Sequence, residues 1–167
     1  MSSDLLHALH DSPLATSIRE SASLFPWIEG LHVLSITLVV GTIAIVDLRL
    51  LGYRSHRRGA KQLIQDLLPF TWVMFVIAVV TGSLMFISNA PSYWINMQFR
   101  IKLCMIVFAG LNMAVFHLTA YRKIGDWDEA LPPPMLARIA GATSLFLWIL
   151  TVFFGRWIGF TLTHAPG

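Results

Sequence analysis

Residues 29–52 read EGLHVLSITLVVGTIAIVDLRLLG, a run with an apolar middle and polar ends. Between His32 and Asp47 there is no ionisable residue, so the natural surroundings of this segment are lipid rather than water. A helix of this length crosses most of a bilayer, which puts His32 near one membrane surface and Asp47, followed by Arg49, near the other. Polar side chains in membrane helices normally face the protein interior and mark functional sites, so both ends are candidate sites.

The whole chain has the composition of an integral membrane protein. Of its 167 residues, 56% are hydrophobic and 13% are charged, which is too little polar surface for a soluble domain of this length. The net charge of +3 provides no nucleic-acid-binding surface, so we expect no nucleic-acid partner. The single cysteine, Cys104, excludes a disulfide framework.

Four apolar segments are long enough to cross a bilayer as helices. We place the spans at about residues 28–52, 68–89, 100–121 and 139–163. The sequence therefore predicts an all-α fold, an integral-membrane up-down four-helix bundle surrounded by the lipid bilayer. Residues 28–163 would form this transmembrane domain, and residues 164–167 a C-terminal tail.

Residues 1–27 precede the first span, and we expect them to form a periplasmic interfacial segment. Ser12 followed by Pro13 is typical of an N-cap and the first residue of a helix. The sequence that follows is semi-amphipathic, which favours a short N-terminal helix lying on the membrane surface.

The distribution of basic residues predicts the orientation. Two of the three predicted loops contain most of the positive charge, with acidic residues mixed into the second of them: Arg54, Arg57, Arg58 and Lys61; then Arg122, Lys123 and Arg138 with Asp126, Asp128 and Glu129. Loops rich in Lys and Arg stay in the cytoplasm. We therefore expect a protein of the bacterial cytoplasmic (inner) membrane with both termini in the periplasm.

The ionisable residues of the spans fall at two depths. His32 and Asp47 are fifteen residues apart, about 22 Å along a helix, and the same spacing separates Lys102 from His117 in the third span. The first and third helices of an up-down bundle run in the same direction. His32 is therefore expected level with Lys102 near the outer side, and Asp47 level with His117 near the inner side.

Other polar residues join these two levels. Arg156 belongs to the outer level, with Glu29 one turn beyond His32, and Arg49 and Asn112 belong to the inner level. A purely structural role is the alternative at each depth. Asp47 paired with His117 or Arg49 would fasten helices together, and Lys102 and Arg156 would extend to the lipid headgroups.

Haem is the first candidate ligand for these residues. A helical bundle can hold a porphyrin between helices, with a neutral imidazole on the iron and cations on the propionates. His32 would be the leading axial ligand and His117 the next, and Lys102, Arg100 and Arg156 would meet propionates or quinone oxygens. The predicted function is electron transfer by a b-type haem protein with quinone or a periplasmic redox protein, and an oxidoreductase subunit is one form of it.

Three alternatives stay open. Met85, Cys104, Met105 and His32 lie at similar predicted depth and are soft enough for Cu(I), which would indicate copper transport or handling. A quinone-binding or assembly subunit without metal would use His32, Asp47 and the arginines for carbonyl and proton contacts. A cofactor-free structural subunit of a membrane complex, or a homo-oligomer, needs neither ligand.

A set of short motifs occurs together in this chain: EGLH at Glu29–His32, DLRLLG at Asp47–Gly52, Lys102 followed by Leu, N-x-x-x-x-H at Asn112–His117 and GRW at Gly155–Trp157. The combination resembles a bacterial family of small four-helix membrane proteins that has only a domain-of-unknown-function label. The resemblance covers essentially the whole chain and implies the fold but no activity.

A looser similarity is to the CopD-type copper-resistance membrane domain and the HemJ-type protoporphyrinogen oxidase. Those proteins have a histidine early in a first span and a lysine early in a later span, matched here by His32 and Lys102. The HemJ-type layout implies b-type haem with this histidine as a ligand. After the first span this chain has Asp-Leu-Arg where HemJ-type proteins have Leu-Pro-Arg, so porphyrinogen oxidation is not carried across.

Overall fold

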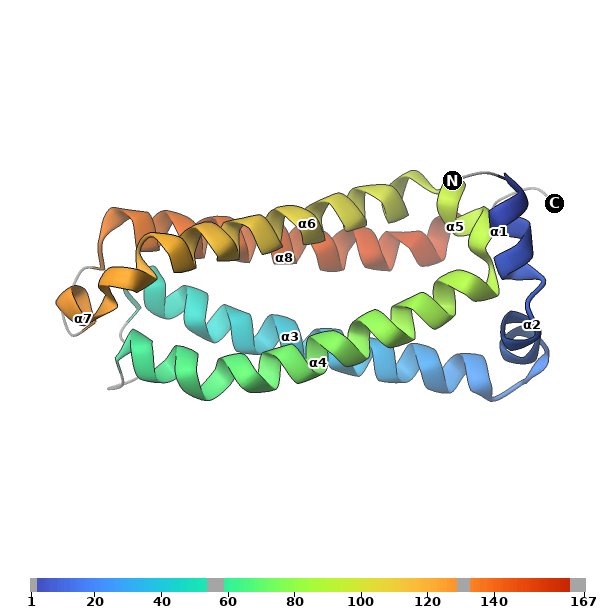
Figure 1. The fold of residues 1–167 in the computed structure, drawn as a ribbon, viewed down its shortest axis with the longest axis horizontal. Coiled ribbons are helices and arrows are strands. Elements are labelled where there is room, and N and C mark those ends of the chain that lie inside the picture. The colour runs from blue at the N-terminus through green and yellow to red at the C-terminus, as the bar shows by residue number, and fades with distance from the viewer. Residues whose placement is uncertain (1–2, 54–58, 129–132, 163–167) are drawn as a thin grey trace.

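The computed structural model describes residues 3–53, 59–128 and 133–162, and four long helices dominate this part of the chain (Figure 1). Each of the four is long and apolar enough to cross a membrane. The prediction of an all-α membrane bundle is therefore confirmed. The long helices are α3 (Leu24–Leu50), α4 (Ala60–Ser88), α6 (Met97–Leu118) and α8 (Met135–Leu162).

Short helices cover the two ends of the bundle. α1, α2 and α5 lie at the end where the chain begins and finishes, which we call the termini end (Figure 1). A 3-10 turn, η1, leads into α7 at the opposite end, which we call the α7 end. Their bounds are Ser3–His10 for α1, Pro13–Glu20 for α2, Ala90–Ile95 for α5, Tyr121–Lys123 for η1 and Ile124–Trp127 for α7.

The long helices begin before the predicted spans and end one to three residues before those spans end. α3 begins at Leu24, four residues before the predicted span, and so includes Pro26 in its first turn. Proline is tolerated there, since the first N–H groups of a helix have no intrahelical partner. α4 begins at Ala60 rather than near residue 68, because its first two turns are polar but helix-compatible. Hydropathy locates the lipid-embedded part of each helix and misses these polar turns.

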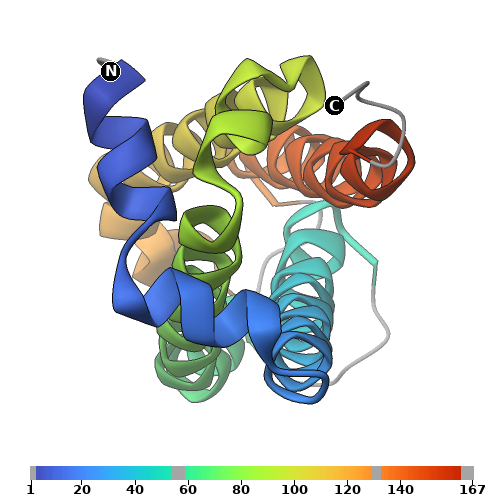
Figure 2. The same cartoon turned by 90° about the vertical axis from the view of Figure 1, so that its right-hand side faces the viewer.

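The bundle consists of two helix pairs joined along one seam. α3 packs along α4, α6 packs along α8, and the two pairs meet mainly where α3 contacts α8. The view along the bundle in Figure 2 shows α4 and α6 as neighbours at the remaining side of the square. These two helices make little direct contact with each other.

Small and hydroxylic residues fasten the seams. At the α3–α8 seam, a Cβ built on Gly141 would lie 3.0 Å from the backbone oxygen of Asp47 and 3.0 Å from Cβ of Leu50, so the backbones approach closely there. Between α3 and α4, the hydroxyls of Thr42 and Thr71 are hydrogen-bonded at 2.8 Å. A hydroxyl pair of this kind satisfies both groups without water.

The N-terminal segment folds onto the termini end. Ser12 caps α2 by accepting a hydrogen bond from the backbone N–H of Ala15, and Pro13 is the first helical residue, as predicted. The preceding helix, α1, is not among the predicted elements. Arg19 ties the segment to the bundle by donating to the backbone oxygens of His10 (2.6 Å) and Ser88 (3.0 Å).

The α7 end is closed by Asp128 and a small apolar core. The Asp128 carboxylate accepts the backbone N–H of Lys61 at the start of α4 (2.8 Å), and its backbone oxygen accepts from Nη2 of Arg49 (3.1 Å). Arg54, Arg57, Arg58 and Glu129, which contribute to the orientation prediction, lie outside the described residues, as does the tail at 164–167. The buried core here comprises Leu50, Ala60, Ile64, Phe116, Ala120, Ile124, Trp127 and Ala137.

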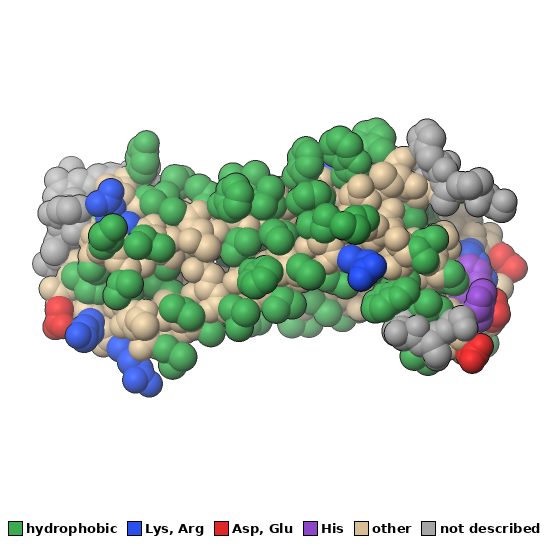
Figure 3. All heavy atoms as spheres, turned by 90° about the horizontal axis from the view of Figure 1, so that it is seen from above, with side chains coloured by type: hydrophobic (Ala, Val, Ile, Leu, Met, Phe, Trp, Pro, Cys, Tyr) green, Lys and Arg blue, Asp and Glu red, His purple; other side chains and the backbone are tan. Residues whose placement is uncertain are grey.

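The surface agrees with a membrane location. Figure 3 shows one face of the molecule with apolar side chains along its length and most charged side chains gathered at the two ends. Large apolar side chains point outward along all four long helices, for example Val33, Val76, Val107 and Phe153. In a membrane these side chains face lipid rather than water.

Gly141→Leu should separate the two helix pairs, because a side chain at this position meets the α3 backbone. We expect a loss of about 1–3 kcal/mol, seen as a lower thermal unfolding midpoint in detergent. Ala142→Leu is the matched control, since Ala142 is exposed on the adjacent position and the new side chain would face lipid. Equal midpoints for the two variants would contradict the close approach at Gly141.

Candidate functional site

His32 is held by Thr81 on the neighbouring helix. Its Nδ1 lies 3.0 Å from the Thr81 hydroxyl oxygen, which itself lies 2.7 Å from the backbone oxygen of Ile77 and 3.2 Å from that of Ala78. The one hydroxyl hydrogen is donated to the backbone, so the oxygen accepts from Nδ1–H. The neutral imidazole then has its lone pair on Nε2, which is the protonation pattern of a metal-ligating histidine.

Residues of all four long helices meet at this depth, which we call the termini-side level: His32, Thr81, Gly82, Lys102 and Gly155. The His32 ring lies directly on Gly82, where an added Cβ would be 2.9 Å from Cε1. The Lys102 side chain lies along Gly155, 3.6 Å from the position of an added Cβ, and is close enough to His32 for their charges to interact. The structure thus places His32 and Lys102 at one level.

Arg100, Arg156 and Glu29 do not join this level. All three side chains are exposed, and the Arg156 guanidinium lies 5.3 Å from the centre of the Phe160 ring. Glu29 is near α5, where burial raises the pKa of Tyr93 and the Glu29 carboxylate raises it further. Of the cations predicted to meet propionates, only Lys102 lies within the bundle.

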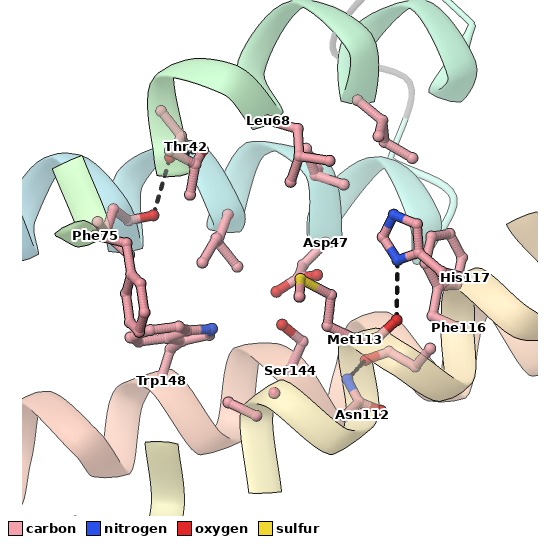
Figure 4. Close-up of a pocket in the computed structure, with 18 of the residues that line it drawn as sticks. Thr42, Asp47, Leu68, Phe75, Asn112, Met113, Phe116, His117, Ser144 and Trp148 are labelled. Carbon is pink, nitrogen blue, oxygen red and sulfur yellow. Dashed lines mark hydrogen bonds between the residues drawn. The ribbon is translucent and has the colours of Figure 1, made fainter. Parts of the chain in front are cut away.

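A partly open cavity of about 210 Å³ lies nearer the α7 end, between the two helix pairs. Most of the residues that line it are apolar, and Figure 4 labels most of the polar ones together with some of the apolar ones. Asp47 and Ser144 meet near its middle, and Met113 and His117 line the part toward α7. This α7-side level contains Asp47, Asn112 and His117, three of the four residues that the sequence predicts for the inner depth.

Asp47 and His117 present unused polar atoms to this cavity. Asp47 is 4% exposed, lies beside Ser144 in Figure 4, and its Oδ2 has no hydrogen-bond partner among the described residues. His117 Nδ1 lies 2.9 Å from the backbone oxygen of Met113, which can only accept, so Nδ1 carries the proton and the lone pair is on Nε2. In Figure 4 that second nitrogen points away from α6.

Arg49 and Asn112 have structural contacts. Arg49 reaches Asp128 at the α7 end, and Asn112 donates from Nδ2 to the backbone oxygen of Ala140 (2.9 Å), which links α6 to α8. Asp47 lies beside Ser144, and His117 bonds the backbone oxygen of Met113. No hydrogen bond among the described residues pairs Asp47 with His117.

The residues proposed for copper differ in their exposure. Cys104 is exposed, whereas Met85, Met105 and His32 are half-buried. Within residues 3–53, 59–128 and 133–162, no group of three or more His, Cys, Asp or Glu side chains is placed to hold a metal ion.

The termini-side level has nitrogen donors of the kind that bind a haem iron. His32 offers a bare Nε2 with its Nδ1 already anchored, Lys102 offers a second nitrogen at the same level, and Gly82 and Gly155 are the small residues that flank them. The cavity near His117, at about 210 Å³, is below the roughly 300–1,000 Å³ typical of cofactor sites.

Sequence reasoning missed three contributors to these levels. Thr81, which orients His32, and the aromatic residues Phe75 and Trp148, which line the cavity, have no signal of their own in an apolar helix. A threonine that lies on the partner helix at the depth of a histidine is the one pattern that could have indicated Thr81.

Gly82→Ala should displace the His32 ring and destabilise the α3–α4 pair, because the new Cβ would overlap Cε1. We expect a loss of about 1–3 kcal/mol, measured as a lower thermal midpoint in detergent. Gly41→Ala is the matched control, since nothing lies within 4 Å of a Cβ at Gly41. If both variants unfold at the wild-type temperature, the contact between His32 and Gly82 is wrong.

Comparisons with known proteins give a family and no activity. No curated protein and no solved structure matches the chain significantly. A family model described as a family of unknown function matches residues 24–161, which include both levels and all four long helices. The chain belongs to this family, DUF6644.

Proposed function

We propose that this protein binds b-type haem in the bacterial cytoplasmic membrane and transfers electrons to or from quinone or a periplasmic redox protein. The observation that supports this most is the hydrogen bond from His32 Nδ1 to Thr81, because it leaves Nε2 free as a ligand inside the bundle. Bound haem would supply one-electron redox chemistry, which none of the side chains provides alone.

The residues of the termini-side level would hold the group in different ways. Nε2 of His32 would bind the iron, and Thr81 would fix the orientation of the imidazole and raise its basicity. Lys102 would be a second ligand in its neutral form or a charge partner for a propionate in its protonated form. His117 is the next candidate ligand, at the other level.

The proposed orientation has the α7 end in the cytoplasm and the termini end in the periplasm. Among the described residues, the α7 end contains Lys61, Arg122, Lys123 and Arg138 in or next to its loops. Near the termini end the basic residues are Arg19, Arg100 and Arg156. The chain between α3 and α4 also contains Arg54, Arg57 and Arg58, so the excess of basic residues favours a cytoplasmic α7 end by the positive-inside rule. The proposed haem would then lie on the periplasmic side.

His32→Ala should abolish the Soret band of protein purified after expression with ample haem, because the axial ligand is removed. His7→Ala, on the exposed face of α1, should leave the spectrum unchanged. The measurement is the absorption spectrum of each purified protein, wild type and both variants, in the oxidised and the reduced state. A wild-type protein without a Soret band would overturn the proposal, and an unchanged spectrum for His32→Ala would move the ligand elsewhere.

Thr81→Val should keep the Soret band but raise the haem midpoint potential, on the order of tens of millivolts. Valine keeps the shape of threonine but removes the acceptor for Nδ1–H, which makes the imidazole a weaker donor to Fe(III). Thr37→Val is the control, since the Thr37 hydroxyl donates to the backbone oxygen of Val33 on its own helix and its side chain is exposed. Redox titration decides; equal potentials in both variants would contradict the role of Thr81.

A further inference from the structure

We propose that the α7-side cavity binds the ring of a lipid-soluble quinone or quinol. This inference gives the quinone partner of the proposed function a binding site. It rests on the proposed function for the redox role of the quinone. The binding site itself is argued from the cavity, its polar atoms and its opening.

The size and walls of the cavity suit one substituted six-membered ring. An apolar protein cavity of about 150 Å³ holds benzene, and this one has about 210 Å³. Phe75, Trp72 and Trp148 supply aromatic surface for a flat ring, and the remaining wall is mainly aliphatic. A saturated lipid chain would fill the same space but leave the polar atoms of the wall unpaired.

The polar atoms match a ring with oxygen atoms on separate edges. Asp47 Oδ2 is buried without a partner beside the Ser144 hydroxyl, and in Figure 4 the Trp148 ring nitrogen is turned toward the same region. His117 Nε2 lies at a different part of the wall. A quinol hydroxyl donates to Asp47 or to His117 Nε2, and a quinone carbonyl accepts from Ser144 or Trp148.

The cavity opens where the bundle is least closely packed. Trp72 of α4 lines the cavity and is nonetheless 46% exposed, and Gly110 of α6 lines it and is also exposed. The helices that contribute these two residues, α4 and α6, make little direct contact with each other. Both residues lie within candidate membrane spans. A ring attached to a long hydrocarbon tail can therefore enter from the lipid while its tail stays between α4 and α6.

Decylubiquinone titrated into the purified full-length protein in detergent tests this site through quenching of tryptophan fluorescence. We expect saturable quenching for the wild type. Ser144→Leu, which fills the cavity and removes a hydroxyl, should bind at least about 10-fold more weakly. Ser83→Leu is the matched control because Ser83 is exposed on α4, outside the cavity lining, and it should bind like the wild type.

A second pair of variants tests the opening. Gly110→Phe places a large side chain at the opening and should weaken binding about 10-fold, whereas Gly41→Phe, on the exposed side of α3, should not. Nothing lies within 4 Å of a Cβ at either glycine, so both variants should fold even if Ser144→Leu does not. Unsaturable quenching of the wild type, or equal affinities for Gly110→Phe and Gly41→Phe, would overturn the proposal.

His32→Ala separates this site from the proposed haem. It should bind decylubiquinone with wild-type affinity while losing the Soret band, because the two levels are on different parts of the bundle. Ser144→Leu should lose quinone binding and keep the Soret band. A wild-type protein that binds decylubiquinone but has no Soret band would refute only the proposed haem binding. A wild-type protein that has a Soret band but does not bind decylubiquinone would refute only this quinone site.

Discussion

A polar group surrounded by hydrocarbon has to find its partner within the protein, and this constraint determines most of the structure. The hydroxyls in the spans comply by donating to a backbone oxygen of their own helix, as Ser35, Thr37 and Thr151 do. Thr42 and Thr81 go further and also bond a residue of another helix. Against this background the free oxygen of Asp47 is an exception, and it faces the cavity.

The fold and the depth of the polar residues could be predicted from the sequence, because both depend on distances along the chain. The rise per residue of a helix is constant, so equal spacings put His32 and Lys102 at one depth, and Asp47 and His117 at another. Hydropathy likewise located all four spans. It does not mark helix ends such as Leu24 and Ala60, where helix formation no longer depends on lipid contact.

The details of each site depend on how the helices are rotated and how closely they approach, which hydropathy does not encode. Thr81 and Gly82 matter because α4 turns them toward His32, whereas their sequence neighbours Val80 and Ser83 are exposed. Arg100 and Arg156 have the right depth but project outward. Their exposed side chains illustrate that depth alone does not bring residues together.

The division of the bundle into two pairs with one main seam has a thermodynamic consequence. Each pair has its own interface, whereas the cavity has walls from both pairs and exists only where they are associated. Any molecule that occupies the cavity therefore binds the associated state alone and shifts the association equilibrium by mass action. In that sense a lipid-borne ligand would act as an assembly factor for the protein, with the membrane as its reservoir.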